Sequence, residues 1–162
     1  MKKIALVTDS TADLTADLKK ELNIHVIPLR VRFGHTEFTD GELTAADFLQ
    51  TSQPSPEEFR QLYQRLLADH DAILSIHLSA NLSGTLNAAA LAKADLNGEI
   101  HLVDSHNISL GIGLLLKEAA RLIAEEHPLP QIVEKLEATR KNIVTLFTLN
   151  TLEYLHKGGR RS

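Results

Sequence analysis

The chain has 162 residues, 43% of them hydrophobic, enough for one compact core that buries about two-thirds of the unfolded surface. Its 17 Lys and Arg against 21 Asp and Glu give a net charge of -4 with no block of like charges, which argues against nucleic acid as a partner. The absence of cysteine excludes disulfides, thiolate metal ligands and cysteine nucleophiles, and it fits the cytoplasm, where we expect the protein to reside.

The first part of the chain predicts short elements separated by turns. The apolar run of residues 3–8 stops at Thr8 and Asp9, which is too short for a signal peptide and reads as a strand. We then expect a helix over 15–23, a β-branched strand over 24–33, a hairpin-like excursion at 36–39 and a short helix at 44–50. Residues 51–56 should form an extended loop with exposed hydroxyls, because each proline keeps the residue before it out of the helical region.

The second part alternates regularly between strands and helices. Ser55 and Glu58 form a capping box that predicts a helix from Pro56 to Ala68. The later elements are strands at 72–78, 100–103 and 143–149 and helices at 84–94, 112–126, 131–140 and 150–156. Charges interrupt the longest apolar stretch, 108–124, so we predict no transmembrane segment. The alternation indicates the α/β class, with a three-layer, mostly parallel sheet and helices on both faces.

Three hydroxyl-rich loops follow strands, at residues 8–11, 79–85 and 104–109. In parallel sheets, ligands collect at the carboxyl ends of the strands, where such loops lie. A helix that begins at Ser83, Gly84 and Thr85 would present free N–H groups, and the glycine would let an anion approach the backbone. These residues therefore suit a carboxylate or a phosphate, although Ser83 and Thr85 could simply cap the helix.

Catalytic alternatives are weaker. The consecutive residues Asp104-Ser105-His106 point to opposite sides of an extended segment and cannot form a triad. His77 could serve as a phosphoryl acceptor, or as a general base toward Ser83 if the fold places Asp9 or Asp104 behind it. A half-buried strand histidine is the simpler interpretation.

Neither a metal nor a nucleotide cofactor is predicted. The eight histidines include no pair at helical spacing with a carboxylate. Gly111-Ile112-Gly113 resembles part of a dinucleotide fingerprint, but Leu116 stands at the third glycine position.

Several motifs, taken in order, resemble the DegV family. They are Val7-Thr8-Asp9-Ser10-Thr11-Ala12-Asp13-Leu14, Ile27-Pro28-Leu29, Thr51-Ser52-Gln53-Pro54, Leu82-Ser83-Gly84-Thr85, Val103-Asp104-Ser105, and Leu152-Glu153-Tyr154-Leu155 with Lys157-Gly158-Gly159-Arg160. The resemblance covers the whole chain but only part of the family's length. It implies that residues 1–149 are an N-terminal α/β domain, that 150–162 begin the connection to a second domain, and that the chain is truncated there with this domain absent.

In the family, a fatty acid lies between the two domains, and the resemblance assigns its carboxylate to Thr51 and Ser83, joined by a histidine of the second domain. The loops and helices themselves add Gly84 and Thr85 near the head group, with Ser10, Ile108 and Leu114 as further contacts. Ile108 and Leu114 would line the tunnel for the acyl chain, as would the neighbouring Leu110 and Leu115, with ordinary packing in the core as the alternative for all four.

The implied function is a carrier without catalytic chemistry or cofactor, which binds a long-chain fatty acid such as palmitate. It would present this ligand to a fatty acid kinase of the dihydroxyacetone-kinase-like type for lipid metabolism. Two rival hypotheses stay open at this point: a hydrolase or phosphoryl carrier that uses His77 and Ser83, and a binder of small anions at the same loops.

Overall fold

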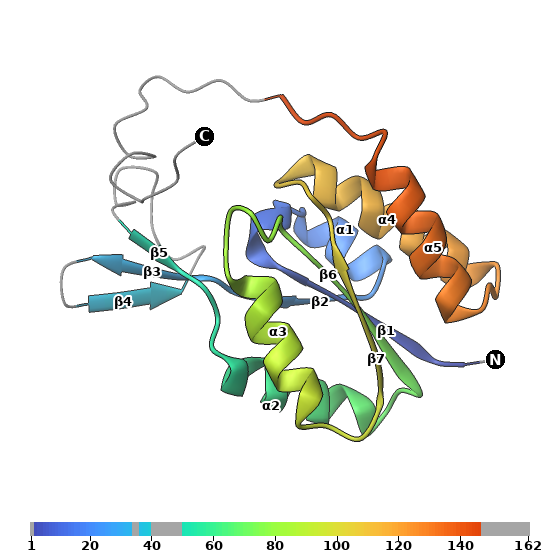
Figure 1. Cartoon of the computed structure of the whole chain (residues 1–162), viewed down its shortest axis with the longest axis horizontal. Helices are drawn as coiled ribbons and strands as arrows, with labels where there is room; N and C mark the ends of the chain where they lie inside the picture. Colours follow the sequence, from blue (N-terminus) through green and yellow to red (C-terminus); the bar gives the residue numbers. More distant parts are fainter. Residues whose placement is uncertain (1, 34–35, 40–49, 147–162) are drawn as a thin grey trace.

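The computed structural model describes residues 2–33, 36–39 and 50–146. For residues 31–33, 36–39, 50 and 51, it describes the backbone alone. Its centre is a parallel sheet with the strand order β2-β1-β6-β7 (Figure 1). The strands are β1 (Ile4–Asp9), β2 (Ile24–Ile27), β6 (Ala72–His77) and β7 (Glu99–Asp104). Every residue of β6 is buried, as expected for a central parallel strand covered on both faces.

Helices cover both faces of this sheet, which confirms the predicted three layers (Figure 1). Helices α2 (Pro56–Leu67) and α3 (Thr85–Ala94) bury an apolar layer against one face, which includes the fully buried Val7, Phe59 and Ile73. Helices α4 (Leu110–Ala124) and α5 (Leu129–Arg140) do the same on the other face. The short α1 (Ala16–Glu21) and a single 3-10 turn, η1 (Ser10–Ala12), connect β1 to β2.

A second, antiparallel sheet has the order β4-β3-β5, with β3 (Arg30–Phe33), β4 (Thr36–Thr39) and β5 (Gln50–Ser52). The single strand predicted over 24–33 is wrong, because the chain leaves the first sheet at Pro28 and Leu29 and enters the second. Proline has no N–H to donate to a strand ladder, so a break at this point is physically expected. The predicted excursion at 36–39 is confirmed as β4, which pairs with β3.

Two other local predictions near this sheet need correction. Gln50 was expected to end a helix, and residues 51 and 52 were expected in a loop, but all three form β5 against β3. The extended conformation that the prolines favour is also the conformation of a strand, and β3 offers an edge to pair with. Residues 44–49 of the predicted helix lie outside the described residues.

The strand predicted over 143–149 is not formed in its described part, since residues 143–146 have no strand assignment. Val144 and Leu146 are 80% and 90% exposed, so the apolar pattern that favoured a strand lies at the surface. Residues 147–149 and the helix predicted over 150–156 lie outside the described residues. Among the described helices, none is long and apolar enough to cross a bilayer.

Candidate functional site

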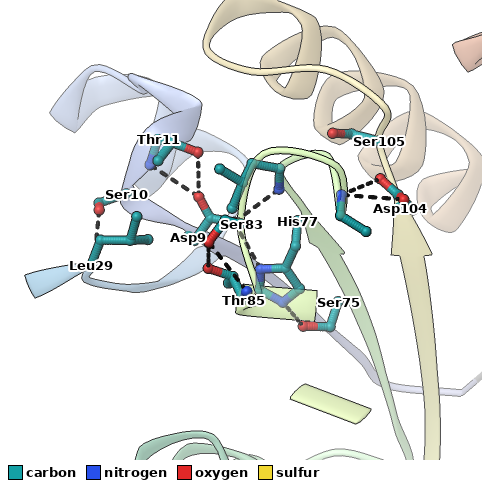
Figure 2. A network of polar contacts seen from close by, with 12 residues as sticks. Asp9, Ser10, Thr11, Leu29, Ser75, His77, Ser83, Thr85, Asp104 and Ser105 are labelled. Carbon is teal, nitrogen blue, oxygen red and sulfur yellow. Dashed lines mark hydrogen bonds and ion pairs between the residues drawn. The ribbon is translucent and has the colours of Figure 1, made fainter. Parts of the chain in front are cut away.

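The three predicted loops meet at the carboxyl edge of the parallel sheet (Figure 2). The Ser79 N–H donates to Asn107 O at 2.9 Å, which joins the loop after β6 to the loop after β7. The Ser109 N–H donates to Thr11 O at 2.9 Å, which joins the loop after β7 to η1. The edge is therefore a single hydrogen-bonded surface made from loops far apart in the sequence.

Ser83, Gly84 and Thr85 lie where the sequence placed them, at the start of α3. The Ser83 and Thr85 hydroxyls are 2.9 Å apart, and Ser83 Oγ also accepts from the Thr85 N–H at 3.3 Å. The capping interpretation is thus correct for one N–H group. The N-cap residue is Gly84 and makes no side-chain cap, so N–H groups further into the first turn remain available to an anion.

Thr51 lies in β5, with its backbone paired to Val31, while its side chain is outside the described part. The segment that follows it reaches α3 through Gln53. A Cβ added to Gly84 would lie 2.1 Å from Gln53 Oε1, so the Gln53 carboxamide rests directly on the Gly84 backbone. This contact brings the segment of Thr51 beside the loop of Ser83.

The remaining residues predicted to contact the ligand differ in their burial and in their hydrogen bonding. Ser10 Oγ accepts from the Leu29 N–H at 2.9 Å and so links the end of β1 to the passage from β2 to β3. Ile108 is half-buried and Leu114 is 58% exposed, but Leu115 is completely buried and belongs to the core. Leu114 borders a hollow of about 990 Å³ whose apolar lining comes mainly from β1 and α4, and neither Ser10 nor Ser83 contributes to it.

A chain of buried polar side chains lies beneath the loops (Figure 2). The Tyr63 hydroxyl donates to Ser75 Oγ at 2.8 Å, and Ser75 Oγ lies 2.7 Å from His77 Nε2. His77 Nδ1 lies 2.9 Å from Asp9 Oδ2, which also accepts the Leu78 N–H at 3.0 Å. His77 is fully buried, so its prediction as a half-buried histidine is wrong.

In this hydrogen-bonded network, each residue donates to the next in the order Tyr63, Ser75, His77 and Asp9. Burial by itself would raise the pKa of Asp9, but the hydrogen bond from His77 and the attraction of that ring, with bonds from Thr11 and Leu78, lower it overall. Asp9 is therefore an acceptor, and burial raises the pKa of Tyr63, which stays a donor. Since Tyr63 donates to Ser75, the Ser75 hydroxyl is left to donate to His77 Nε2, and His77 Nδ1 faces the Asp9 carboxylate.

Ser75, His77 and Asp9 have the residue types and order of a hydrolase relay, but Ser75 is completely buried and its hydroxyl already lies between two partners. The condition for a catalytic His77 is met on the acid side, because Asp9 lies behind it. A nucleophilic Ser83 is not supported, because His77 Nε2 bonds Ser75 and the Ser83 hydroxyl bonds Thr85. Asp104 accepts N–H groups of Ala80 and His106 instead.

Sequence reasoning missed Gln53, Tyr63 and Ser75. Ser75 and His77 stand two apart on one strand and so share a face, which was a usable signal for their contact. Tyr63 and Gln53 carried no such signal, because their partners come from other elements. Among the described residues, no group of three or more His, Cys, Asp or Glu side chains is arranged to hold a metal ion.

Comparison with protein families matches residues 3–162 to the DegV family of uncharacterised proteins. A DegV domain-containing protein from Deinococcus radiodurans is 39% identical, over 97% of this chain and 60% of its own length. One from Staphylococcus aureus strain MRSA252 is 37% identical, over 100% of this chain and 62% of its own length. The chain thus spans about 60% of the length of these curated relatives.

Solved structures give the same result. A DegV family protein from Thermus thermophilus, described for its fatty acid binding, has a TM-score of 0.88 and 37% identity, with 98% of this chain and 60% of that chain covered. DegV from Bacillus subtilis, described as a fatty acid binding protein, has a TM-score of 0.88 and 32% identity, with 99% and 61% covered.

Proposed function

The chain belongs to the DegV family, and from this premise we propose that it binds a long-chain fatty acid such as palmitate. Thr51 and Ser83 hold the carboxylate at the start of α3. The observation that carries this proposal is the contact of Gln53 with Gly84, which sets the segment of Thr51 beside the Ser83 hydroxyl and the N-terminus of α3. Structures of relatives from Thermus thermophilus and Bacillus subtilis are described for fatty acid binding, which supports the choice of ligand.

The proposed head-group contacts are neutral hydroxyls together with the positive end of α3. Neutral donors can hold a carboxylate without burying a counter-charge beside it. The acyl chain then contributes most of the affinity, because each buried methylene adds about 0.8 kcal/mol. Hydroxyls that fix orientation and an apolar tail that supplies affinity are the properties expected of a carrier.

We also propose that the protein is not an enzyme and that its partner is a fatty acid kinase, which phosphorylates the bound carboxylate for lipid metabolism. A carrier of this kind needs no nucleophile of its own. The burial of Ser75 and the engagement of His77 by Ser75 and Asp9 favour this proposal over the hydrolase and phosphoryl-carrier hypotheses.

The site proposed for residues 1–149 is part of a larger one. Because the chain spans about 60% of its relatives' length, we propose that residues 150–162 lead toward a second domain that completes the tunnel. The chain of 162 residues should therefore fold but bind fatty acid only weakly. A weak site calls for an assay that detects millimolar affinity at individual residues.

The test is a titration of the ¹⁵N-labelled chain with decanoate, followed by NMR at each backbone amide, with decanol as the ligand that lacks a carboxylate. We expect saturable shifts at the amides of residues 83–85 with decanoate and none there with decanol. Inorganic phosphate, titrated in parallel, distinguishes the small-anion hypothesis, which requires phosphate to produce the same shifts. If decanoate leaves these amides unmoved, the proposed function is wrong.

A matched pair of variants locates the contact. Ser83→Ala should weaken decanoate binding by about 1–3 kcal/mol, the range for a lost hydrogen bond to a charged group. Asn81→Ala lies in the same loop with an exposed side chain and should leave the affinity unchanged. Mass spectrometry of an organic extract of the purified protein then asks which fatty acid, if any, it retains from the cell.

A further inference from the structure

We infer that Gln53 is a third polar contact for the head group and that residue 84 is a glycine in order to admit the Gln53 carboxamide. This inference rests on the proposed function and extends it to a residue that determines how the carboxylate is held. It begins from one close approach, between a side chain that follows β5 and the backbone that opens α3.

The approach involves the whole carboxamide. From the position of a Cβ built on Gly84, Oε1 of Gln53 is 2.1 Å away, Cδ is 2.8 Å away and Nε2 is 2.9 Å away. A Cβ at residue 84 would displace this exposed carboxamide, the far end of a flexible side chain, from its place on the backbone. The carboxamide therefore fills the space beside the Gly84 backbone, directly after Ser83 in the sequence.

The backbone at Gly84 does not itself require glycine. Its φ of -78° and ψ of 8° lie in a region open to every L-amino acid. Alanine would be compatible with this conformation, and the atoms that a Cβ would strike first are those of Gln53. The glycine is thus explained by its neighbour and not by a turn.

The chemistry of Gln53 suits a carboxylate. Its side chain is exposed, and within the described part of the chain its carboxamide has no hydrogen-bond partner, so two N–H donors remain available. Gln53 comes two residues after Thr51 in the sequence and lies against the residue after Ser83. A neutral amide at this position adds a donor without adding charge.

A double-mutant cycle tests the inference, with decanoate as the ligand and the NMR titration of the chain as the assay. Gln53→Ala should weaken binding about tenfold, as expected for one hydrogen bond to a carboxylate. Gln53→Glu should weaken it more, because a like charge then faces the ligand. Gly84→Ala should match Gln53→Ala in the wild-type background and have less than about a twofold effect when Gln53 is already alanine.

The outcomes separate the inference from the proposal beneath it. If the wild-type chain fails to bind decanoate, the proposed function fails and the inference fails with it. If the wild type binds and Gln53→Ala binds equally well, only the role of Gln53 is wrong. If Gly84→Ala is equally harmful after Gln53→Ala, the glycine serves the ligand directly and the reason given for it is wrong.

Two further measurements protect against variants that fold poorly. Gly113→Ala is the control for replacing a glycine near a helix start, because its nearest contact to an added Cβ is an ordinary 3.6 Å from Leu14. The side-chain NH₂ resonances of Gln53, assigned by their loss in Gln53→Ala, should move with decanoate in the wild-type chain. Resonances that stay fixed while the amides of 83–85 shift would overturn the inference without any substitution at residue 84.

Discussion

Asp9 Oδ2 lies 2.9 Å from His77 Nδ1, although 68 residues separate the two in sequence. The contact exists because β1 and β6 are neighbouring parallel strands whose carboxyl ends meet at one edge of the sheet. Both side chains are completely buried, so the pair belongs to the interior of the protein and supports the loops from below.

Asp9→Asn should lower the free energy of unfolding by about 3 kcal/mol, because an amide offers N–H groups where Leu78 and Thr11 already donate. Urea denaturation followed by circular dichroism measures this loss. Asp13→Asn is the control: Asp13 is exposed with a φ of 50°, which asparagine tolerates, so its stability should stay within about 0.5 kcal/mol. Equal stability of the two variants would contradict the buried role of Asp9.

Tyr63 and Ser75 should differ in their sensitivity to substitution. Tyr63→Phe removes one donor and should cost about 1 kcal/mol, since Ser75 can still bond His77. Ser75→Ala leaves both the Tyr63 hydroxyl and His77 Nε2 unpaired in the interior and should cost about 2–4 kcal/mol. Chemical denaturation of the two variants measures which one loses more stability. A larger loss in Tyr63→Phe would contradict the hydrogen-bonded network in which Tyr63 donates to Ser75 and Ser75 bonds His77.

Stability should decline in mildly acidic solution because of His25. Its pKa is lowered, first by burial and then by repulsion from His70 and Arg65. The unfolded chain therefore takes up the proton more readily, so this contribution to stability is complete above the unfolded pKa of about 6.5 and is lost as the pH falls through the lower folded pKa. Thermal unfolding between about pH 7.5 and pH 5.5 measures the decline.

His25→Phe should flatten that pH dependence, since phenylalanine does not titrate. His106→Asn is the matched control, because His106 is exposed with a φ of 54° and asparagine accepts that conformation. A decline that persists unchanged in His25→Phe would assign it to other groups.

Two glycines near the start of α4 should respond in opposite ways to alanine. A Cβ at Gly111 would lie 2.6 Å from Thr145 Oγ1 and 2.7 Å from Asn107, so Gly111→Ala should cost about 1–3 kcal/mol. Gly113→Ala meets only an ordinary contact at 3.6 Å and should stabilise the helix by about 0.5–1 kcal/mol. Differential scanning calorimetry compares the two, and similar melting temperatures would show that Thr145 and Asn107 do not crowd Gly111 in this way.

Features set by neighbouring residues were predictable from the sequence. The capping box of Ser55 and Glu58 is present with both of its hydrogen bonds, and α2 begins at Pro56 as predicted. The alternation of strands and helices was sufficient for the parallel sheet, because a parallel pair needs a crossover between its strands. The loop of residues 79–85 likewise lies at the carboxyl edge, as its position after a strand requires.

Features set by strand order were not predictable. Asp9 was recognised as a possible acid for His77, but only the adjacency of β1 and β6 brings the two together. The pairing of β5 with β3 joins segments about twenty residues apart, and local propensity carries no information about which edge a strand will find. The contact of Gln53 with Gly84 depends on that pairing and was hidden for the same reason.

The buried chain from Tyr63 to Asp9 also constrains how the interior can change over evolution. Ser75 and His77 each bond a neighbour on both sides, so an apolar replacement of either one leaves its neighbours without that partner. Acceptable change at these positions therefore requires coordinated replacement of residues on β6 and β1, with intermediates less stable than either end. Ser75, His77 and Asp9 should accordingly be inherited as a set.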